Sequence, residues 1–82
     1  MLERLRESRL LVIGGSSGIG EATAALAAQA GARVTIASRS DTRLSAALER
    51  LPGGVAGARL DVTDPAAVDD FFAGAPAWDH VI

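Results

Sequence analysis

Glycines and serines follow one another closely in one stretch, Gly14-Gly15-Ser16-Ser17-Gly18-Ile19-Gly20. Gly14 permits a tight turn, Gly18 lets a bound group approach the backbone, and Gly20 allows a following helix to pack close against a preceding strand. The unpaired amides and the positive dipole end of such a helix bind phosphate. The stretch therefore predicts a site for the pyrophosphate of a dinucleotide, provided that it joins a strand to a helix.

The residues around these glycines indicate which class of phosphate-binding loop is present. Ser16 and Ser17 either add hydroxyl donors to the loop, or one of them caps the helix. A nucleoside triphosphatase loop needs lysine followed by serine or threonine after its last glycine, whereas Gly20 is followed by Glu21. This excludes the triphosphatase class.

Apolar runs and segments of helical spacing alternate along the chain and give the loop its context. Runs at 10–13, 34–37, 55–60 and 79–82 predict strands, and periodic segments predict helices over 19–30 and 44–51. A third helix is expected from an Asp64 N-cap with Pro65 at the first helical position, burying Val68, Phe71 and Phe72. This βαβαβαβ order predicts an α/β fold with a doubly wound parallel sheet (Rossmann) in strand order 3-2-1-4. The glycine loop then joins the first strand to the first helix.

The end of the second predicted strand bears on which dinucleotide fits. NAD-specific sites carry a carboxylate about 20 residues beyond the glycines, which accepts hydrogen bonds from the ribose. Here the sequence is Ser38-Arg39-Ser40. A guanidinium between two hydroxyls suits a 2′-phosphate, so we expect NADP. The alternative is a solvated Arg39 that pairs with nearby Asp41.

Length, charge and composition exclude several other classes of function. The 82 residues are expected to form one small domain, 1–82. A net charge of −2 provides no positively charged surface that would attract nucleic acid or an anionic membrane. Without cysteine there are no disulfides or thiolate metal sites, and no metal site is expected. No apolar run has the length of a membrane span or a signal segment. We therefore expect a soluble, cytoplasmic protein.

The spacing of Gly14, Gly18, Ile19 and Gly20 resembles the TGxxxGIG signature of the short-chain dehydrogenase/reductase family. The resemblance extends over nearly all of the chain, although Ile13 replaces the usual threonine. It implies that Asp61 and Val62, after the third strand, hold the adenine. The alternative for Asp61 is a local turn in which its carboxylate binds backbone amides.

The catalytic residues of that family, a serine, a YxxxK pair and commonly an asparagine, have no counterpart here, because the chain contains neither tyrosine nor lysine. We assign no catalytic residue and read His80 and Trp78 as packing residues. The resemblance implies the NADP(H)-binding portion of a longer oxidoreductase that transfers hydride between nicotinamide and a carbonyl or alcohol substrate. A non-catalytic NADP(H)-binding or sensing module and an isolated fragment without activity are the alternatives. The exposed edge of the fourth strand predicts a homo-oligomer.

Overall fold

The computed structural model describes residues 7–14, 18–74 and 78–82, and its centre is one parallel sheet. The strands β1 (Arg9–Ile13), β2 (Arg33–Ser38), β3 (Ala56–Arg59) and β4 (His80–Val81) lie in the order β3-β2-β1-β4. The strand β1 is central because Leu10, Leu11 and Val12 are buried on both of its faces. The predicted strand order 3-2-1-4 is confirmed.

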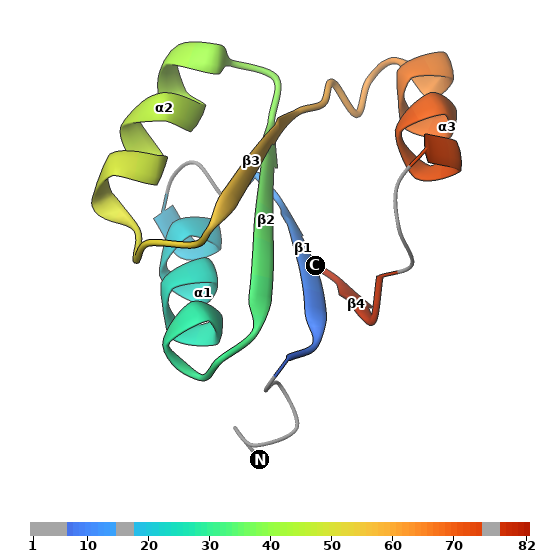
Figure 1. Cartoon of the computed structure of the whole chain (residues 1–82). Helices are drawn as coiled ribbons and strands as arrows, with labels where there is room; N and C mark the ends of the chain where they lie inside the picture. The colour runs from blue at the N-terminus through green and yellow to red at the C-terminus, as the bar shows by residue number, and fades with distance from the viewer. Residues whose placement is uncertain (1–6, 15–17, 75–77) are drawn as a thin grey trace.

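Helices cover both faces of the sheet. The helices α1 (Gly18–Gln29) and α2 (Asp41–Arg50) lie on one face, and α3 (Pro65–Gly74) lies on the other (Figure 1). Most of the predicted ends lie within one or two residues of the observed ones. The helix α2 begins three residues before its predicted start. No helix in the described ranges is long and apolar enough to cross a membrane.

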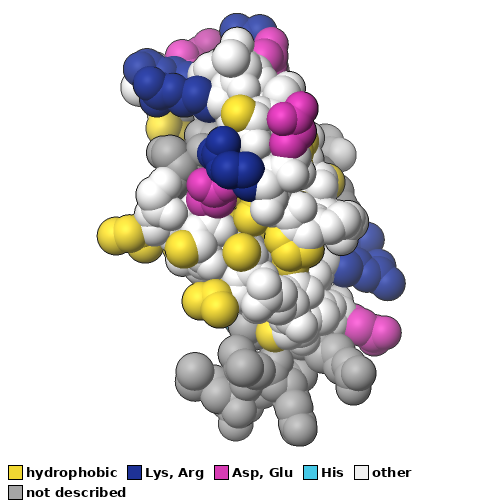
Figure 2. Space-filling model, turned by 90° about the vertical axis from the view of Figure 1, so that its left-hand side faces the viewer, with side chains coloured by type: hydrophobic (Ala, Val, Ile, Leu, Met, Phe, Trp, Pro, Cys, Tyr) yellow, Lys and Arg dark blue, Asp and Glu magenta, His cyan; other side chains and the backbone are white. Residues whose placement is uncertain are grey.

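The larger core lies between the sheet and the helices α1 and α2. The helix α1 contributes small side chains, Ala24 and Ala27, which allow it to approach the strands closely. Ile19 and Leu26 of this helix are 87% and 66% exposed. The alanine face of α1 packs on the sheet, and these larger side chains lie outside it. Figure 2 shows the outer side of α1 and α2, where apolar side chains reach the surface among charged groups.

A smaller core lies between the sheet and α3. Val68, Phe71 and Trp78 pack against the buried side chain of Leu11 and its neighbours in this layer. Phe72 was also expected to be buried but is 39% exposed, and it contacts Phe71 edge to face at a centroid distance of 5.3 Å. Adjacent residues on a helix point about 100° apart, so only one of the two phenylalanines faces the sheet.

Local hydrogen bonds fix where the helices begin and end. Gly31 has φ of 94°, and the N–H of Ala32 binds the carbonyl of Ala27 at 3.1 Å, which is a Schellman ending for α1. Asp64 Oδ1 accepts the N–H groups of Ala66 and Ala67 at 3.1 and 3.3 Å. The predicted N-cap of the third helix is thereby confirmed.

The strand β4 pairs with β1 on one side only. Backbone hydrogen bonds from Asp79 to Arg9 and from Ile82 to Leu11, both 2.9 Å, extend the pairing beyond the strand itself. No strand of the described ranges pairs with its other side, and Val81 and Ile82 are exposed. His80 is exposed too, so the packing role expected for it is not observed.

Candidate functional site

A cavity of about 580 Å³ lies where β1, β2 and β3 end. Ligands of open α/β sheets bind outside the carboxyl ends of the strands, and this cavity occupies that position. Its lining comes from three consecutive strand-to-helix connections: Ile13, Gly14, Ala37, Ser38, Arg39, Ser40, Arg43, Leu60, Asp61, Val62 and Thr63.

The glycine loop borders the cavity at the end of β1. Gly14 has φ of 79° and donates its N–H to the carbonyl of Ala37 at 2.8 Å, which ties the start of the loop to β2. Gly18 opens α1 with φ of 56°. A Cβ built on either glycine meets no protein atom within 4 Å, so the space in front of both backbones is open. A bound phosphate group requires this kind of space.

The other members of the loop have different environments. Ile19 is exposed, and Gly20 is half-buried in the first turn of α1. Gly15, Ser16 and Ser17 lie outside the described residues, so the two alternatives for the serines stay open.

Ser38, the last residue of β2, and Ser40 build the turn that starts α2. The hydroxyl of Ser38 accepts the N–H of Ser40 at 3.3 Å, and the hydroxyl of Ser40 accepts the N–H of Arg43 at 3.3 Å. Ser40 is therefore the N-cap of α2, a structural role that the sequence reading did not assign. A capping hydroxyl accepts through its oxygen, so its O–H group remains able to donate a hydrogen bond.

The arginines beside this turn give the cavity its charge. Arg39 lines it, and the carboxylate of Asp41 lies 3.7 Å from Arg59 instead of pairing with Arg39. No ion pair of Arg39 is found among the described residues, and its alternative role as a partner of Asp41 is not observed. Arg43, in the first turn of α2, lines the same cavity and was missed. Arg43 lies four residues after Arg39 and three after the capping Ser40, and this sequence pattern could have predicted its place beside Arg39.

The Asp61 carboxylate, which follows β3, lines the same cavity. Its Oδ1 accepts the hydroxyl of Thr63 at 2.6 Å and the N–H of Thr63 at 2.9 Å, so the local turn considered as an alternative is present. These hydrogen bonds, with smaller contributions from the charges of Arg39 and Arg59, hold the pKa of Asp61 below its ordinary value. Asp61 is thus a fixed anion that lines the cavity beside the exposed Val62.

A comparison with known families agrees with this geometry, since residues 8–79 match the short chain dehydrogenase family. The chain belongs to that family. Among curated members, it is 55% identical over 51 residues to the short-chain dehydrogenase/reductase fsr5 of Gibberella fujikuroi, covering 61% of this chain and 19% of that protein. It is 42% identical over 69 residues to the 1-deoxy-11-beta-hydroxypentalenate dehydrogenase of Streptomyces avermitilis, covering 80% of this chain and 26% of that protein.

Solved structures of short-chain dehydrogenases have the same fold. One short chain dehydrogenase/reductase family protein superposes with a TM-score of 0.87 at 36% identity, over 94% of this chain and 33% of that chain. The MalC reductase/Diels-Alderase of Malbranchea aurantiaca superposes with a TM-score of 0.80 at 32% identity, over 98% of this chain and 37% of that chain. The chain thus spans between about a fifth and two fifths of the length of these relatives.

The polar side chains at the cavity of this member of the short chain dehydrogenase family are suited to binding. They comprise hydroxyls, guanidinium groups and one carboxylate that is held ionised. His80 pairs in register with Leu10, near the start of β1, whereas the cavity lies at the other end of that strand. The described lining thus offers hydroxyl groups, guanidinium groups and the Asp61 carboxylate as binding groups at the strand ends.

Proposed function

We propose that residues 1–82 are the first part of a single NAD(P)-binding Rossmann domain, and that their cavity binds NADP(H). The observation that carries this proposal is the pair of arginines, Arg39 and Arg43, on one wall of a cavity at the ends of three parallel strands. No carboxylate lies at the end of β2, where an NAD-specific site would have one. A 2′-phosphate is the part of NADP(H) that two neighbouring guanidinium groups recognise.

Each part of the cofactor has residues that fit it. The backbone at Gly14 and Gly18 leaves room for the pyrophosphate, which the open space in front of both glycines supports, and Gly20 belongs to the same loop as the residue at which the helix packs close to the strand. We assign the following further residues to the cofactor: Ser16, Ser17 and Ile19 to the pyrophosphate loop, Ser38, Arg39 and Ser40 to the ribose and its 2′-phosphate, and Asp61 and Val62 to the adenine.

The chemistry proposed for the whole protein is hydride transfer. When bound, the nicotinamide supplies or accepts the hydride, with a small carbonyl or alcohol compound as substrate. The described residues contribute binding and orientation: the glycine loop positions the phosphates, and the arginines fix the adenosine end. The names of relatives such as the ipsdienol dehydrogenase of Ips pini, 54% identical over 41 residues, support this class of reaction. A homo-oligomeric state and a cytoplasmic location stay predictions.

Calorimetric titration of the full natural polypeptide with NADP(H) and NAD(H) tests the proposal. Arg39→Ala should weaken the binding of NADP(H) by about 1.5 to 3 kcal/mol, roughly ten- to a hundredfold, and leave the affinity for NAD(H) nearly unchanged. Arg50→Ala is the charge-matched control, because Arg50 pairs with Glu21 at 2.7 Å, at the other end of α2. Equal losses for both cofactors in Arg39→Ala would assign Arg39 a structural role.

A further inference from the structure

A second cavity, of about 340 Å³, lies at the opposite end of the sheet from the nucleotide cavity. It begins at the first residues of β1, β2 and β3 and is lined by Arg9, Arg33, Val34, Thr35, Gly54, Ala56 and Trp78. Side chains alternate between the faces of a strand, so Arg9 lies on the same face as Leu11, which packs in the α3 layer. The cavity therefore opens between the sheet and the layer that contains Trp78.

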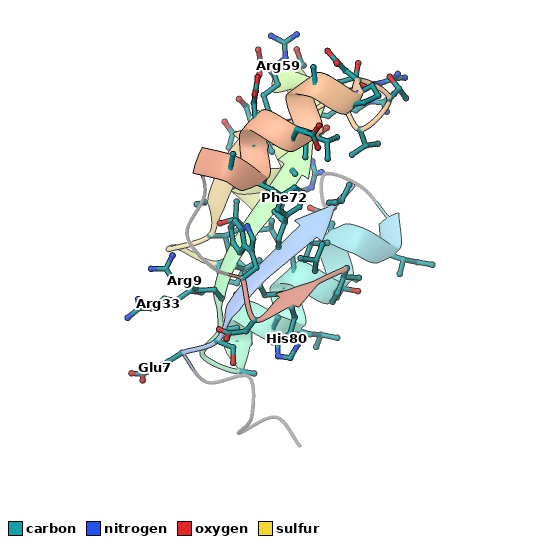
Figure 3. The ribbon with its side chains drawn as sticks, turned by 90° about the vertical axis from the view of Figure 1, so that its right-hand side faces the viewer. Glu7, Arg9, Arg33, Arg59, Phe72 and His80 are labelled. Atoms are coloured by element: carbon teal, nitrogen blue, oxygen red, sulfur yellow. The ribbon has the colours of Figure 1, made fainter. Side chains whose placement is uncertain are left out.

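Two positive charges are held together at this cavity. Arg9 and Arg33 are register partners in neighbouring parallel strands. Figure 3 shows their side chains extending in the same direction from the sheet. Neither guanidinium forms an ion pair with a carboxylate of the described ranges. Like charges at paired strand positions repel each other, so an anion that shares the site would relieve this repulsion.

The nearby carboxylate of Asp79 has another role. Its Oδ2 accepts the backbone N–H of Arg9 at 2.8 Å, which fixes the approach of the chain to β4. Asp79 thus reduces the net positive charge of this corner but binds the backbone of Arg9 instead of either guanidinium.

The other polar side chains of the lining are hydrogen-bond donors as well. Thr35 carries a hydroxyl on the same face as the arginines, since it pairs in register with Leu11. The indole of Trp78 stacks on Phe71 at a centroid distance of 6.3 Å and an interplanar angle of 10°. Its Nε1 is buried and has no hydrogen-bond acceptor among the described residues. A buried donor without an acceptor costs free energy that a ligand with an oxygen acceptor recovers.

We propose that this cavity binds a small oxyanion, either a phosphate or a carboxylate. Arg9 and Arg33 supply charge-assisted hydrogen bonds, Thr35 adds a hydroxyl, and a small shift of the indole brings its N–H to the ligand. The site is separate from the nucleotide cavity, because the two share no lining residue and lie at opposite ends of the strands. It does not depend on the proposed NADP(H) site.

Trp78 provides the readout, since it is the single tryptophan of the 82 residues. The indole N–H resonance of Trp78, assigned with Trp78→Phe in the full natural polypeptide, is followed by nuclear magnetic resonance. Sodium phosphate and sodium acetate are titrated in separate arms, with sodium chloride at matched ionic strength. We expect a saturable shift with an oxyanion that chloride does not produce, and the tighter arm identifies phosphate or carboxylate as the preferred group.

Variants decide whether the arginines bind the anion. Arg9→Gln and Arg33→Gln should each weaken the binding of the oxyanion by about three- to tenfold. Arg50→Gln, in α2 on the other face of the sheet, should leave the affinity unchanged. Arg33→Lys should retain part of the affinity, and an unchanged near-ultraviolet dichroism of the Phe71–Trp78 stack shows that a variant is folded. The proposal is overturned if neither oxyanion gives a saturable shift, if chloride gives the same shift, or if both glutamine variants bind as the wild type does.

Discussion

The carboxylate of Asp41 lies 3.7 Å from the guanidinium of Arg59, across the gap between the first turn of α2 and the end of β3. Both side chains are exposed, at 72% and 71%, so the attraction between them is weak. Its position is more important than its strength. Asp41 follows the Ser38-Arg39-Ser40 turn directly, but its ion pair is with Arg59 and not with Arg39, which lines the cavity.

The first prediction follows from this pair. Arg59→Ala releases Asp41, which then competes with the 2′-phosphate of NADP(H) for Arg39. We expect the ratio of NADP(H) to NAD(H) affinity to fall by about two- to fivefold, the range of an exposed ion pair, as measured by calorimetry. Arg59→Ala combined with Asp41→Asn should restore the ratio. If the double variant prefers NADP(H) no more than Arg59→Ala does, Asp41 has no part in cofactor selection.

The second prediction concerns the glycine loop. A valine at position 18 would place its branched side chain in the open space in front of the backbone, where no protein atom lies within 4 Å. If the pyrophosphate occupies this space, Gly18→Val should abolish the binding of both NADP(H) and NAD(H) in a titration.

The control for this prediction is another glycine with the same backbone constraint. Gly54 also has a positive φ, of 97°, and open space around its Cβ position, but it does not line the nucleotide cavity and belongs to the second cavity instead. Gly54→Val therefore introduces similar strain without blocking the phosphates. Gly18 has no phosphate role if Gly18→Val remains folded and binds both dinucleotides normally.

The features that were predictable from the sequence are those with local causes. Gly31 and Asp64 mark helix ends through backbone geometry and side-chain caps that involve only their neighbours. The glycine loop between a strand and a helix, and hence the end of the sheet at which a phosphate would bind, follows from the same local signals. Alternation of short apolar runs with helical segments then leaves few possible topologies.

The features that were missed depend on how elements meet. Phe72 is apolar and was expected to be buried, but the direction in which α3 packs leaves it exposed. Arg43 reaches the cavity only because Ser40 starts α2 beside it. The second cavity depends on the register between β1 and β2, which pairs Arg9 with Arg33, residues that are distant in the sequence.

The third prediction uses the pKa of Asp61. Thr63 lowers this pKa through its hydroxyl and its N–H, so the folded state favours the ionised carboxylate more than the unfolded state does. The resulting stabilisation is present above the unfolded pKa, about 3.9, and is lost as the pH falls through and below that value. Thr63→Val removes the hydroxyl bond alone. In a carbon-13 titration, the pKa of Asp61 should rise toward its ordinary value and stay slightly below it.

The matched control is Thr42→Val, an exposed position of α2 that does not line the cavity. Between pH 5 and pH 3, the free energy of unfolding should decrease less for Thr63→Val than for the wild type or Thr42→Val. An identical pKa of Asp61 in wild type and Thr63→Val would show that the hydroxyl bond does not hold the carboxylate ionised.

The last prediction concerns the packing of α2 on β3. A Cβ added at Gly57 would lie 2.8 Å from Cδ1 of Leu48, closer than real Cβ atoms approach, and at a tight 3.2 Å from Cγ of Leu44. The end of Leu48 can move, but Leu44 belongs to the buried core and has less freedom. Overpacking costs about 1 to 3 kcal/mol, and the lower backbone entropy of alanine offsets about 0.5 to 1 kcal/mol of this. Gly57→Ala should therefore lower the free energy of unfolding by about 1 kcal/mol in a urea titration.

Gly53→Ala is the control, because a Cβ at Gly53 meets nothing within 4 Å and its φ is not positive. We expect Gly53→Ala to be neutral or slightly stabilising through the unfolded state. If Gly57→Ala is as stable as Gly53→Ala, the close approach of α2 to β3 does not require a glycine at this position.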